Sequence, residues 1–309
     1  MFAVCAGECM VELSGEIGRA ARIGFGGDTL NTAVYLARLG LEPAYLTALG
    51  EDPFSEEMLA AWRREGVRTD LVARLPGRLP GLYAIRTDAR GERRFYYWRS
   101  ASAARELFAA SESAALLATA AGADLLYLSG ITLSLYDPPL RNKLSSLAER
   151  VRARGGEVAF DPNFRPACWS SLAAAKEAIA AFAPLVSIAL PTLLDESALW
   201  GDVSAEAAAS RWRAWGAREA AVKLGAEGAY LASDAGATHV PASAVQVIDS
   251  TAAGDAFNAG YLAMRLRGAA ASEAARTGHE LAAIVVRHAG AIAPREATAP
   301  LTERIRGFR

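Results

Sequence analysis

The stretch Asp249-Ser-Thr-Ala-Ala-Gly-Asp-Ala-Phe-Asn-Ala-Gly260 carries the strongest indication of fold and chemistry in this sequence. A strand-like run, 244–248, precedes it, and an apolar run with helical spacing follows it. The small residues 252–254 leave the backbone uncovered where that helix is expected to begin, so its N–H groups can bind an anion. A carboxylate at Asp255 would repel that anion, but it suits a base that takes a proton from an attacking hydroxyl. An ordinary helix-capping aspartate is the alternative interpretation.

A second glycine-containing turn lies near the N-terminus, at Gly24-Phe-Gly-Gly-Asp-Thr-Leu-Asn31. Apolar residues recur from Leu30 to Ala37 with the spacing i, i+3, i+4, i+7, which predicts a helix that ends near Gly40. The turn lacks the third glycine of the dinucleotide-binding fingerprint, and the sequence contains no G-x-x-x-x-G-K-[ST] motif. These observations argue against a Rossmann cofactor site and exclude a P-loop kinase or GTPase.

Strand-like and helix-like segments alternate along most of the chain, which predicts an α/β fold with parallel strands. The expected strands are 2–6, 10–13, 44–49, 124–128, 157–160, 185–190, 220–224 and 229–232, and the expected helices are 53–65, 138–154, 170–182, 256–267 and 272–288. The runs 72–74, 81–87 and 93–99 break this rhythm as three strands without helices, with a hairpin turn at 88–91.

A small β-sheet lid is therefore expected within a single domain that spans residues 1–309. Its strands fall at approximately 9–22 and 70–100, inserted in the α/β core. Such a lid can close over a ligand and exclude water, and it can also form a dimer surface.

The composition describes a globular chain with balanced charge. With 309 residues, 52% of them hydrophobic, the chain can bury a large core. The 33 basic and 34 acidic residues give a formal net charge of −1, so no overall field favours nucleic acid or a membrane surface. Cys5, Cys9 and Cys168 do not cluster with histidines in sequence, and free thiols are expected. Without a signal-like or membrane-spanning run, the expected location is the cytoplasm.

Taken together, the two turns resemble the two signatures of the ribokinase-like (PfkB) family of carbohydrate kinases. Gly26–Gly40 is similar to the first signature, and Asp249–Asp255 is similar to the second, usually Asp-Thr-x-Gly-Ala-Gly-Asp. The resemblance covers nearly the whole chain and implies a three-layer α/β/α core, a β-sheet lid, and ATP with Mg²⁺. It implies Asp255 as general base and the backbone of Ala252, Ala253 and Gly254 as an anion hole. Ala252 replaces the first glycine of the signature, which a small side chain permits if φ is negative.

Within this family, the sequence is most similar to the bacterial 2-keto-3-deoxygluconate kinases. The stretches that carry this similarity are Gly91–Arg99, Asp161–Pro166 and Asp249–Asp255. A sugar acid has a carboxylate that Arg99 and Arg165 can bind by charge-assisted hydrogen bonds. The implied substrate-binding residues are Gly26, Gly27, Asn31, Tyr83, Tyr97, Arg99, Arg165 and Asp255. The alternatives are an exposed charge for Arg99 and an ion pair with Asp161 for Arg165. Trp98 is expected on the opposite face of its strand from Tyr97 and Arg99, where it packs.

The resemblance also implies contacts on the nucleotide side. The implied cofactor-binding residues are Lys223, Gly225, Gly228, Ala253 and Gly254. Asp195 or Glu196 can contact magnesium through water, although acids at a helix N-terminus are common without any such role. A monovalent cation such as K⁺ is implied near Asp249 and Thr251.

A homo-oligomer that pairs through the lid sheet is expected, because the lid has free strand edges. Kinases for fructose, ribose or 2-keto-3-deoxygalactonate remain alternatives. A non-catalytic sensor of nucleotides or sugar acids on the same fold is the alternative from another functional class.

Overall fold

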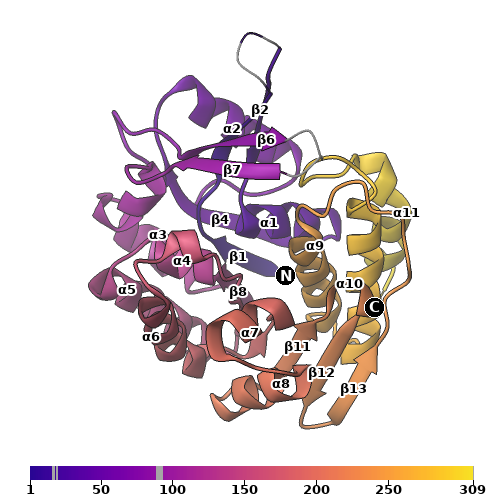
Figure 1. Ribbon diagram of the computed structural model, residues 1–309. Helices are drawn as coiled ribbons and strands as arrows, with labels where there is room; N and C mark the ends of the chain where they lie inside the picture. The colour runs from indigo at the N-terminus through magenta and orange to yellow at the C-terminus, as the bar shows by residue number, and fades with distance from the viewer. Residues whose placement is uncertain (16–17, 19, 88–92, 309) are drawn as a thin grey trace.

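Two β-sheets organise the computed structural model, which describes residues 1–15, 18, 20–87 and 93–308 (Figure 1). Among these residues, the larger sheet has nine strands in the order β13-β12-β11-β10-β9-β8-β1-β4-β5, and the smaller sheet has the order β3-β2-β6-β7. The strands are β1 (Phe2–Ala6), β2 (Met10–Ser14), β3 (Arg22–Gly26), β4 (Glu42–Leu49), β5 (Val72–Arg74), β6 (Leu82–Thr87), β7 (Arg93–Trp98), β8 (Leu125–Ser129), β9 (Glu157–Asp161), β10 (Ile188–Ala189), β11 (Glu219–Lys223), β12 (Ala229–Ser233) and β13 (Gly236–Val240).

Helices cover both faces of the larger sheet and complete a three-layer core. The helices are α1 (Asp28–Arg38), α2 (Pro53–Arg64), α3 (Ser113–Ala120), α4 (Gly130–Ser134), α5 (Pro138–Ala153), α6 (Leu172–Phe182), α7 (Leu193–Trp200), α8 (Ala205–Ala214), α9 (Ala253–Arg265), α10 (Ala271–Val285) and α11 (Arg295–Arg306). Because successive strand residues point to opposite faces, Cys5 packs in one apolar core with α1, α2, α9, α10 and α11. Its neighbour Val4 packs in the other core, with α5, α6 and α8.

The carboxyl ends of the parallel strands form the edge that carries the polar residues. β1, β4, β8, β9, β10 and β11 run parallel to their neighbours in this series. Asp161 ends β9 and Lys223 ends β11. Ligands of open α/β sheets bind beyond the carboxyl ends of the strands, and this is therefore the edge at which a site is expected.

The smaller sheet forms the predicted lid, and Figure 1 shows it above α1 and β4. β2 pairs with β3 and β6 with β7 in antiparallel fashion, whereas β2 and β6 are parallel. The chain passes between core and lid after β1, before α1, before β6 and after β7. The α/β fold with a β-sheet lid is thus confirmed.

Several expected elements differ from the observed ones. The run 72–74 is not a lid strand: as β5 it pairs with β4 at the edge of the larger sheet. The run 244–248 forms no strand, and its Val247 and Ile248 are 58% and 64% exposed. β12 and β13 are antiparallel additions, and β13 and α11 were not expected.

The hairpin turn expected at 88–91 lies outside the described residues. In the described part of the chain, no helix combines the length and apolar character needed to cross a membrane.

Candidate active site

The turn into α9 brings a row of N–H groups to the carboxyl edge of the sheet. Ala252 is the N-cap residue, and Gly254 and Asp255 lie in the first helical turn, where backbone N–H groups have no acceptor within the helix. Ala252 has φ 61° and ψ 15°, so the condition of a negative φ at this position is not met. The left-handed conformation that glycine adopts readily is here adopted by alanine. The turn keeps its shape at the expense of local strain.

Asp255 is buried at the start of α9 and faces the first turn of α1. The Asn31 Nδ2 atom donates a 2.9 Å hydrogen bond to Asp255 Oδ2. Burial, and next the charge of Asp28, raise the pKa of Asp255 to about 7. A carboxylate that is half ionised near neutral pH can accept a proton far better than an exposed aspartate.

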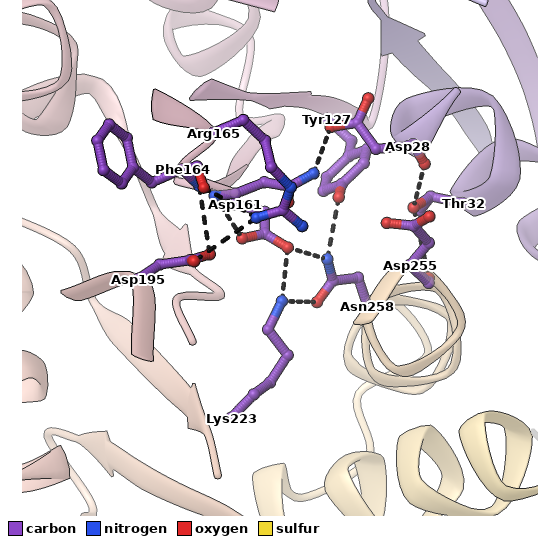
Figure 2. Close-up of polar contacts among 11 residues, drawn as sticks. Asp28, Thr32, Tyr127, Asp161, Phe164, Arg165, Asp195, Lys223, Asp255 and Asn258 are labelled. Atoms are coloured by element: carbon purple, nitrogen blue, oxygen red, sulfur yellow. Dashed lines mark hydrogen bonds and ion pairs between the residues drawn. The ribbon is translucent and has the colours of Figure 1, made fainter. Parts of the chain in front are cut away.

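A buried polar network lies beside Asp255 and includes Lys223 (Figure 2). Lys223 Nζ lies 2.5 Å from Asp161 Oδ2 and 3.1 Å from Asn258 Oδ1. Asn258 Nδ2 in turn donates to Asp161 Oδ2 at 2.7 Å and to the Tyr127 hydroxyl at 3.0 Å. Lys223 is therefore more than a charge at a strand end: its ammonium group is buried and held in place. The same ammonium lies 3.6 Å from where a Cβ atom on Gly254 would be, which places it beside the start of α9.

Tyr83 and Tyr97 are register partners in the lid, with ring centroids 6.1 Å apart. The Tyr83 hydroxyl donates to the Glu12 carboxylate and lies 2.3 Å from where a Cβ atom on Gly26 would be. A Cβ atom on Gly27 would lie 2.3 Å from the Glu8 backbone oxygen. Glycine is therefore required at both positions for the lid to approach α1.

Both arginines of the predicted sugar-acid site already have acidic partners. Arg99 forms a buried ion pair with Glu8, and its NH1 group lies 3.3 Å from Cys168 Sγ. Arg165 is half-exposed, and its NH1 group lies 3.6 Å from Asp195 Oδ1. The alternative pairing of Arg165 with Asp161 is not observed, since Asp161 binds Lys223. The exposed-charge alternative for Arg99 is not observed either, because its side chain is 12% exposed.

Trp98 was expected to pack, but it is 63% exposed in the described chain. It lies on the opposite face of β7 from Tyr97.

The two candidate magnesium contacts, Asp195 and Glu196, lie in different surroundings. Asp195 Oδ2 accepts the Phe164 N–H at 3.2 Å and lies at the polar edge (Figure 2). Glu196 does not face this edge: it is completely buried and binds Arg211 and the Trp212 indole N–H. Neighbouring residues of a helix point about 100° apart, which explains why the two acids diverge. The expectation that Glu196 contacts magnesium is therefore wrong: Glu196 forms a buried ion pair that stabilises the fold.

Among the described residues, no three acidic, His or Cys side chains come together to hold a metal. Asp249 Oδ1 accepts hydrogen bonds from the Thr251 N–H at 3.0 Å and the Thr251 hydroxyl at 2.7 Å. Asp249 Oδ2 accepts the Gly290 N–H at 2.7 Å. These contacts fix the chain just before the turn at Ala252.

The turn after β11 lies at the same edge of the sheet as Asp255. Gly225 has φ 62°, with open space beside it, and Gly228 has φ 109°. A Cβ atom on Gly228 would lie 2.1 Å from the Val240 backbone oxygen. The two glycines therefore shape a close turn at the end of the strand that carries Lys223.

Comparisons with known proteins agree with this arrangement. The pfkB family of carbohydrate kinases matches residues 2–298. The chain belongs to this family.

Relatives of this carbohydrate kinase share both its sequence and its fold. A 2-dehydro-3-deoxygluconokinase from Escherichia coli (strain K12) is 48% identical over 301 residues, which cover 94% of the chain and 96% of that relative. The structure of a 2-dehydro-3-deoxygluconokinase from Thermotoga maritima matches with a TM-score of 0.85 over 98% of each chain, and its 22% identity supports the fold alone. An aminoimidazole riboside kinase from Salmonella enterica, complexed with aminoimidazole riboside and an ATP analogue, matches with a TM-score of 0.81 and 25% identity over 100% of the chain and 99% of its own.

Sequence reasoning missed several polar residues at the edge of this carbohydrate kinase. The most important are Asp28, Asp161, Asn163, Asn258 and Glu8. Asn258 follows Asp255 by three residues on one helix, and that spacing could have suggested a shared face. Asp28 lies inside the first signature but was not weighed separately from its glycines.

Proposed function

We propose that the protein phosphorylates 2-keto-3-deoxygluconate, also called 2-dehydro-3-deoxygluconate, with ATP to give the 6-phosphate. The observation that carries this proposal is a buried carboxylate, Asp255, placed at the open N-terminus of α9 beneath a lid that contributes arginine and tyrosine. The relative that is 48% identical over 96% of its own length bears the name of this activity, which supports the same substrate here.

Asp255 is proposed to act as the general base. Its carboxylate takes the proton of the terminal hydroxyl as that oxygen bonds to the γ-phosphorus of ATP, and the bond to the departing ADP breaks. The N–H groups of Ala252 and Gly254, in the turn formed by Ala252, Ala253 and Gly254, are proposed to stabilise the charge on the transferred group. The Ala253 N–H already donates to the Ser250 backbone oxygen at 3.2 Å. The protonated Asp255 then releases its proton to solvent when the site opens.

The carboxylate of the sugar acid is proposed to lie between the lid and the carboxyl edge. Arg99 and Arg165 offer charged donors, and Tyr83 and Tyr97 line the lid face. Gly26, Gly27 and Asn31, at and just before the start of α1, are proposed to contact the sugar, and Asn31 also donates a hydrogen bond to Asp255. Because Glu8 and Asp195 already balance the two arginines, recognition depends on directed hydrogen bonds more than on excess positive charge.

The nucleotide is proposed to lie over Gly225 and Gly228, with Lys223 and the start of α9 near its phosphates. Magnesium arrives as part of the MgATP substrate and neutralises charge on the phosphates. Asp195 is proposed to contact that ion through water. A monovalent cation such as K⁺, held by the backbone near Asp249 and Thr251, remains a prediction.

The test is ADP release from a panel of sugar acids and neutral sugars, with wild type and Asp255→Asn. We expect 2-keto-3-deoxygluconate to be the best substrate. Turnover by Asp255→Asn should fall by roughly 10²–10⁴-fold, because a positioned base contributes about that factor, while sugar-acid binding persists. Asp234→Asn is the matched control, since its side chain is 86% exposed and lies in a surface ion pair.

Near-normal turnover by Asp255→Asn would overturn the role of the base. Preference for fructose, ribose or 2-keto-3-deoxygalactonate would contradict the proposed substrate but not the proposed kinase activity. ATP binding without any turnover on the panel would favour a sensor.

A further inference from the structure

The carboxyl edge holds more acidic side chains than cations, so not every carboxylate has an ion-pair partner. Three cations each lie against one carboxylate, and the pairs are Lys223–Asp161, Arg165–Asp195 and Arg99–Glu8. Among the described residues, Asp28 and Asp255 are left without an ion-pair partner. Arg99 acts on Asp28 electrostatically but forms no ion pair with it. These two acids lie at the neighbouring starts of α1 and α9 (Figure 2).

Asp28 is held in a fixed position by two hydrogen bonds. Its Oδ1 atom accepts the Thr29 N–H at 2.8 Å, and its Oδ2 atom accepts the Asn163 amide at 2.8 Å. Asn163 has φ 34°, a strained conformation for a residue other than glycine, and its own N–H binds Asp161. A strained residue tied from both sides is not free to turn its amide away from Asp28.

The same turn of α1 also fixes Asp255. Asn31 donates to the Asp255 carboxylate, and the Thr32 hydroxyl lies 3.1 Å from the Asp28 backbone oxygen and 3.4 Å from that of Asp255. Figure 2 shows Asp28, Thr32 and Asp255 side by side where α1 meets α9. The two acids are thus brought together by the contact between two helix starts.

We propose that Asp28 is a positioning residue for the reaction, whose fixed negative charge keeps Asp255 a strong enough base to take the hydroxyl proton. This inference rests on the proposed function of Asp255. A like charge at close range disfavours ionisation, so the negative charge of Asp28 increases the proton affinity of Asp255. Asn163 serves the same end by holding the Asp28 carboxylate in place.

The other groups that face Asp255 do not replace this effect. Besides Asp28, four groups interact with Asp255 electrostatically. They are Tyr35 on α1, Tyr127 on β8, Asp161 on β9 and Lys223 on β11. Asp161 raises the pKa of Asp255, and Lys223 lowers it. Since these two are paired with each other, their effects oppose, and Asp28 remains the largest charge effect on Asp255. Removal of Asp28 should therefore lower the pKa of Asp255.

The test is a carbon-13 NMR titration of aspartate carboxyl groups in the free protein, with Asp255→Asn used to assign the Asp255 signal. In wild type we expect a midpoint near the raised pKa of about 7. In Asp28→Asn the midpoint should fall by at least about one pH unit, the size of effect expected from a neighbouring charge. The acid limb of the kcat profile should move by the same amount, and kcat near pH 8 should fall by roughly two- to ten-fold, because a weaker base transfers the proton less well.

Asn163→Gly provides a second variant, because glycine suits φ 34° and removes only the amide that holds Asp28. We expect a smaller shift in the same direction, and Asp234→Asn should leave the midpoint unchanged. An unmoved Asp255 midpoint in folded Asp28→Asn would overturn the inference. If Asp28→Asn does not fold, an unmoved midpoint in Asn163→Gly overturns it instead. Because the titration needs no substrate, a protein that shows the shift but phosphorylates no sugar acid would contradict only the proposed function.

Discussion

Ala252 is the residue at which the chain turns into α9, and its backbone lies in the left-handed region at φ 61°. This conformation costs an alanine about 1–2 kcal/mol relative to the right-handed region, whereas glycine adopts it freely. The strain is located next to the N–H groups proposed to bind the transferred phosphoryl group. Strained backbone of this kind persists where surrounding contacts hold it, and here Asp249 holds Thr251 and Gly290 on the preceding side.

Ala252→Gly should therefore stabilise the protein by up to about 1 kcal/mol, after allowance for the greater freedom of glycine in the unfolded chain. Urea unfolding of the two proteins measures this difference. Ala253→Gly is the matched control, since Ala253 is the first helical residue of α9, where glycine should not stabilise. Equal effects of the two substitutions would show that strain at position 252 is negligible.

At the scale of elements, α9 and α10 pack with little space between their backbones. A Cβ atom on Gly260 would lie 2.8 Å from the Gly278 Cα atom, and one on Gly278 would lie 2.8 Å from the Phe257 backbone oxygen. Because α9 also carries Asp255 and Asn258, this close contact sets the position of the proposed base from behind. Packing between α9 and α10 therefore helps to fix the position of Asp255.

Gly278→Ala should force the two helices apart and destabilise the protein by roughly 1–3 kcal/mol, as other overpacked core sites do. We also expect kcat to fall, since α9 would shift with Asp255. Thermal unfolding and steady-state kinetics measure the two effects. Ser272→Ala, near the start of the same helix, should change stability by no more than about 0.5 kcal/mol. Unchanged stability in Gly278→Ala would mean that the helices can separate without loss.

Local patterns predicted many elements but not their partners. The alternation of strands and helices predicted the α/β core, and the run without helices predicted β6 and β7. The same pattern could not show that β5 pairs with β4, because pairing depends on contacts far apart in sequence. The run 244–248 has the composition of a strand but stays exposed, since no neighbouring strand pairs with it in the described chain.

The candidate site also has features that local sequence predicts and features that it does not. The glycine turns could be predicted because they need particular residues at adjacent positions. The Asp28–Asn163 contact spans 135 residues and the Asp161–Asn258 contact spans 97, and no local pattern encodes such distances. Glu196 was misplaced as a magnesium contact because the direction of an acid on a helix depends on what the helix packs against.

At the scale of the whole molecule, the lid sheet bears large apolar side chains that are exposed among the described residues. Ile23, Tyr96 and Trp98 are 59%, 47% and 63% exposed. The strand register places Ile23, Leu13, Ala84 and Tyr96 in one row across the sheet, and Trp98 two residues further along β7 lies on the same side. An apolar face of this kind on a sheet with two free edges favours association.

We expect the protein to form dimers through this face, and Trp98→Arg to shift it towards monomers. Analytical ultracentrifugation over a range of concentrations measures both. Val203→Arg is the control, because Val203 is 93% exposed but lies far along the chain in the loop between α7 and α8. A wild-type protein that is monomeric at every concentration would contradict the expectation.

The four places at which the chain passes between core and lid have a consequence for how such an enzyme diversifies. The helix starts that hold Asp28, Asn31 and Asp255 belong to the core, whereas Tyr83 and Tyr97 belong to the lid. Mutations in the lid strands can accumulate without moving α1 against α9, provided that Gly26 and Gly27 keep the two layers in contact. The fold thus places the proposed base on the core and two of the proposed substrate contacts on the lid, so that lid substitutions are expected to change the choice of sugar more than the phosphoryl-transfer step.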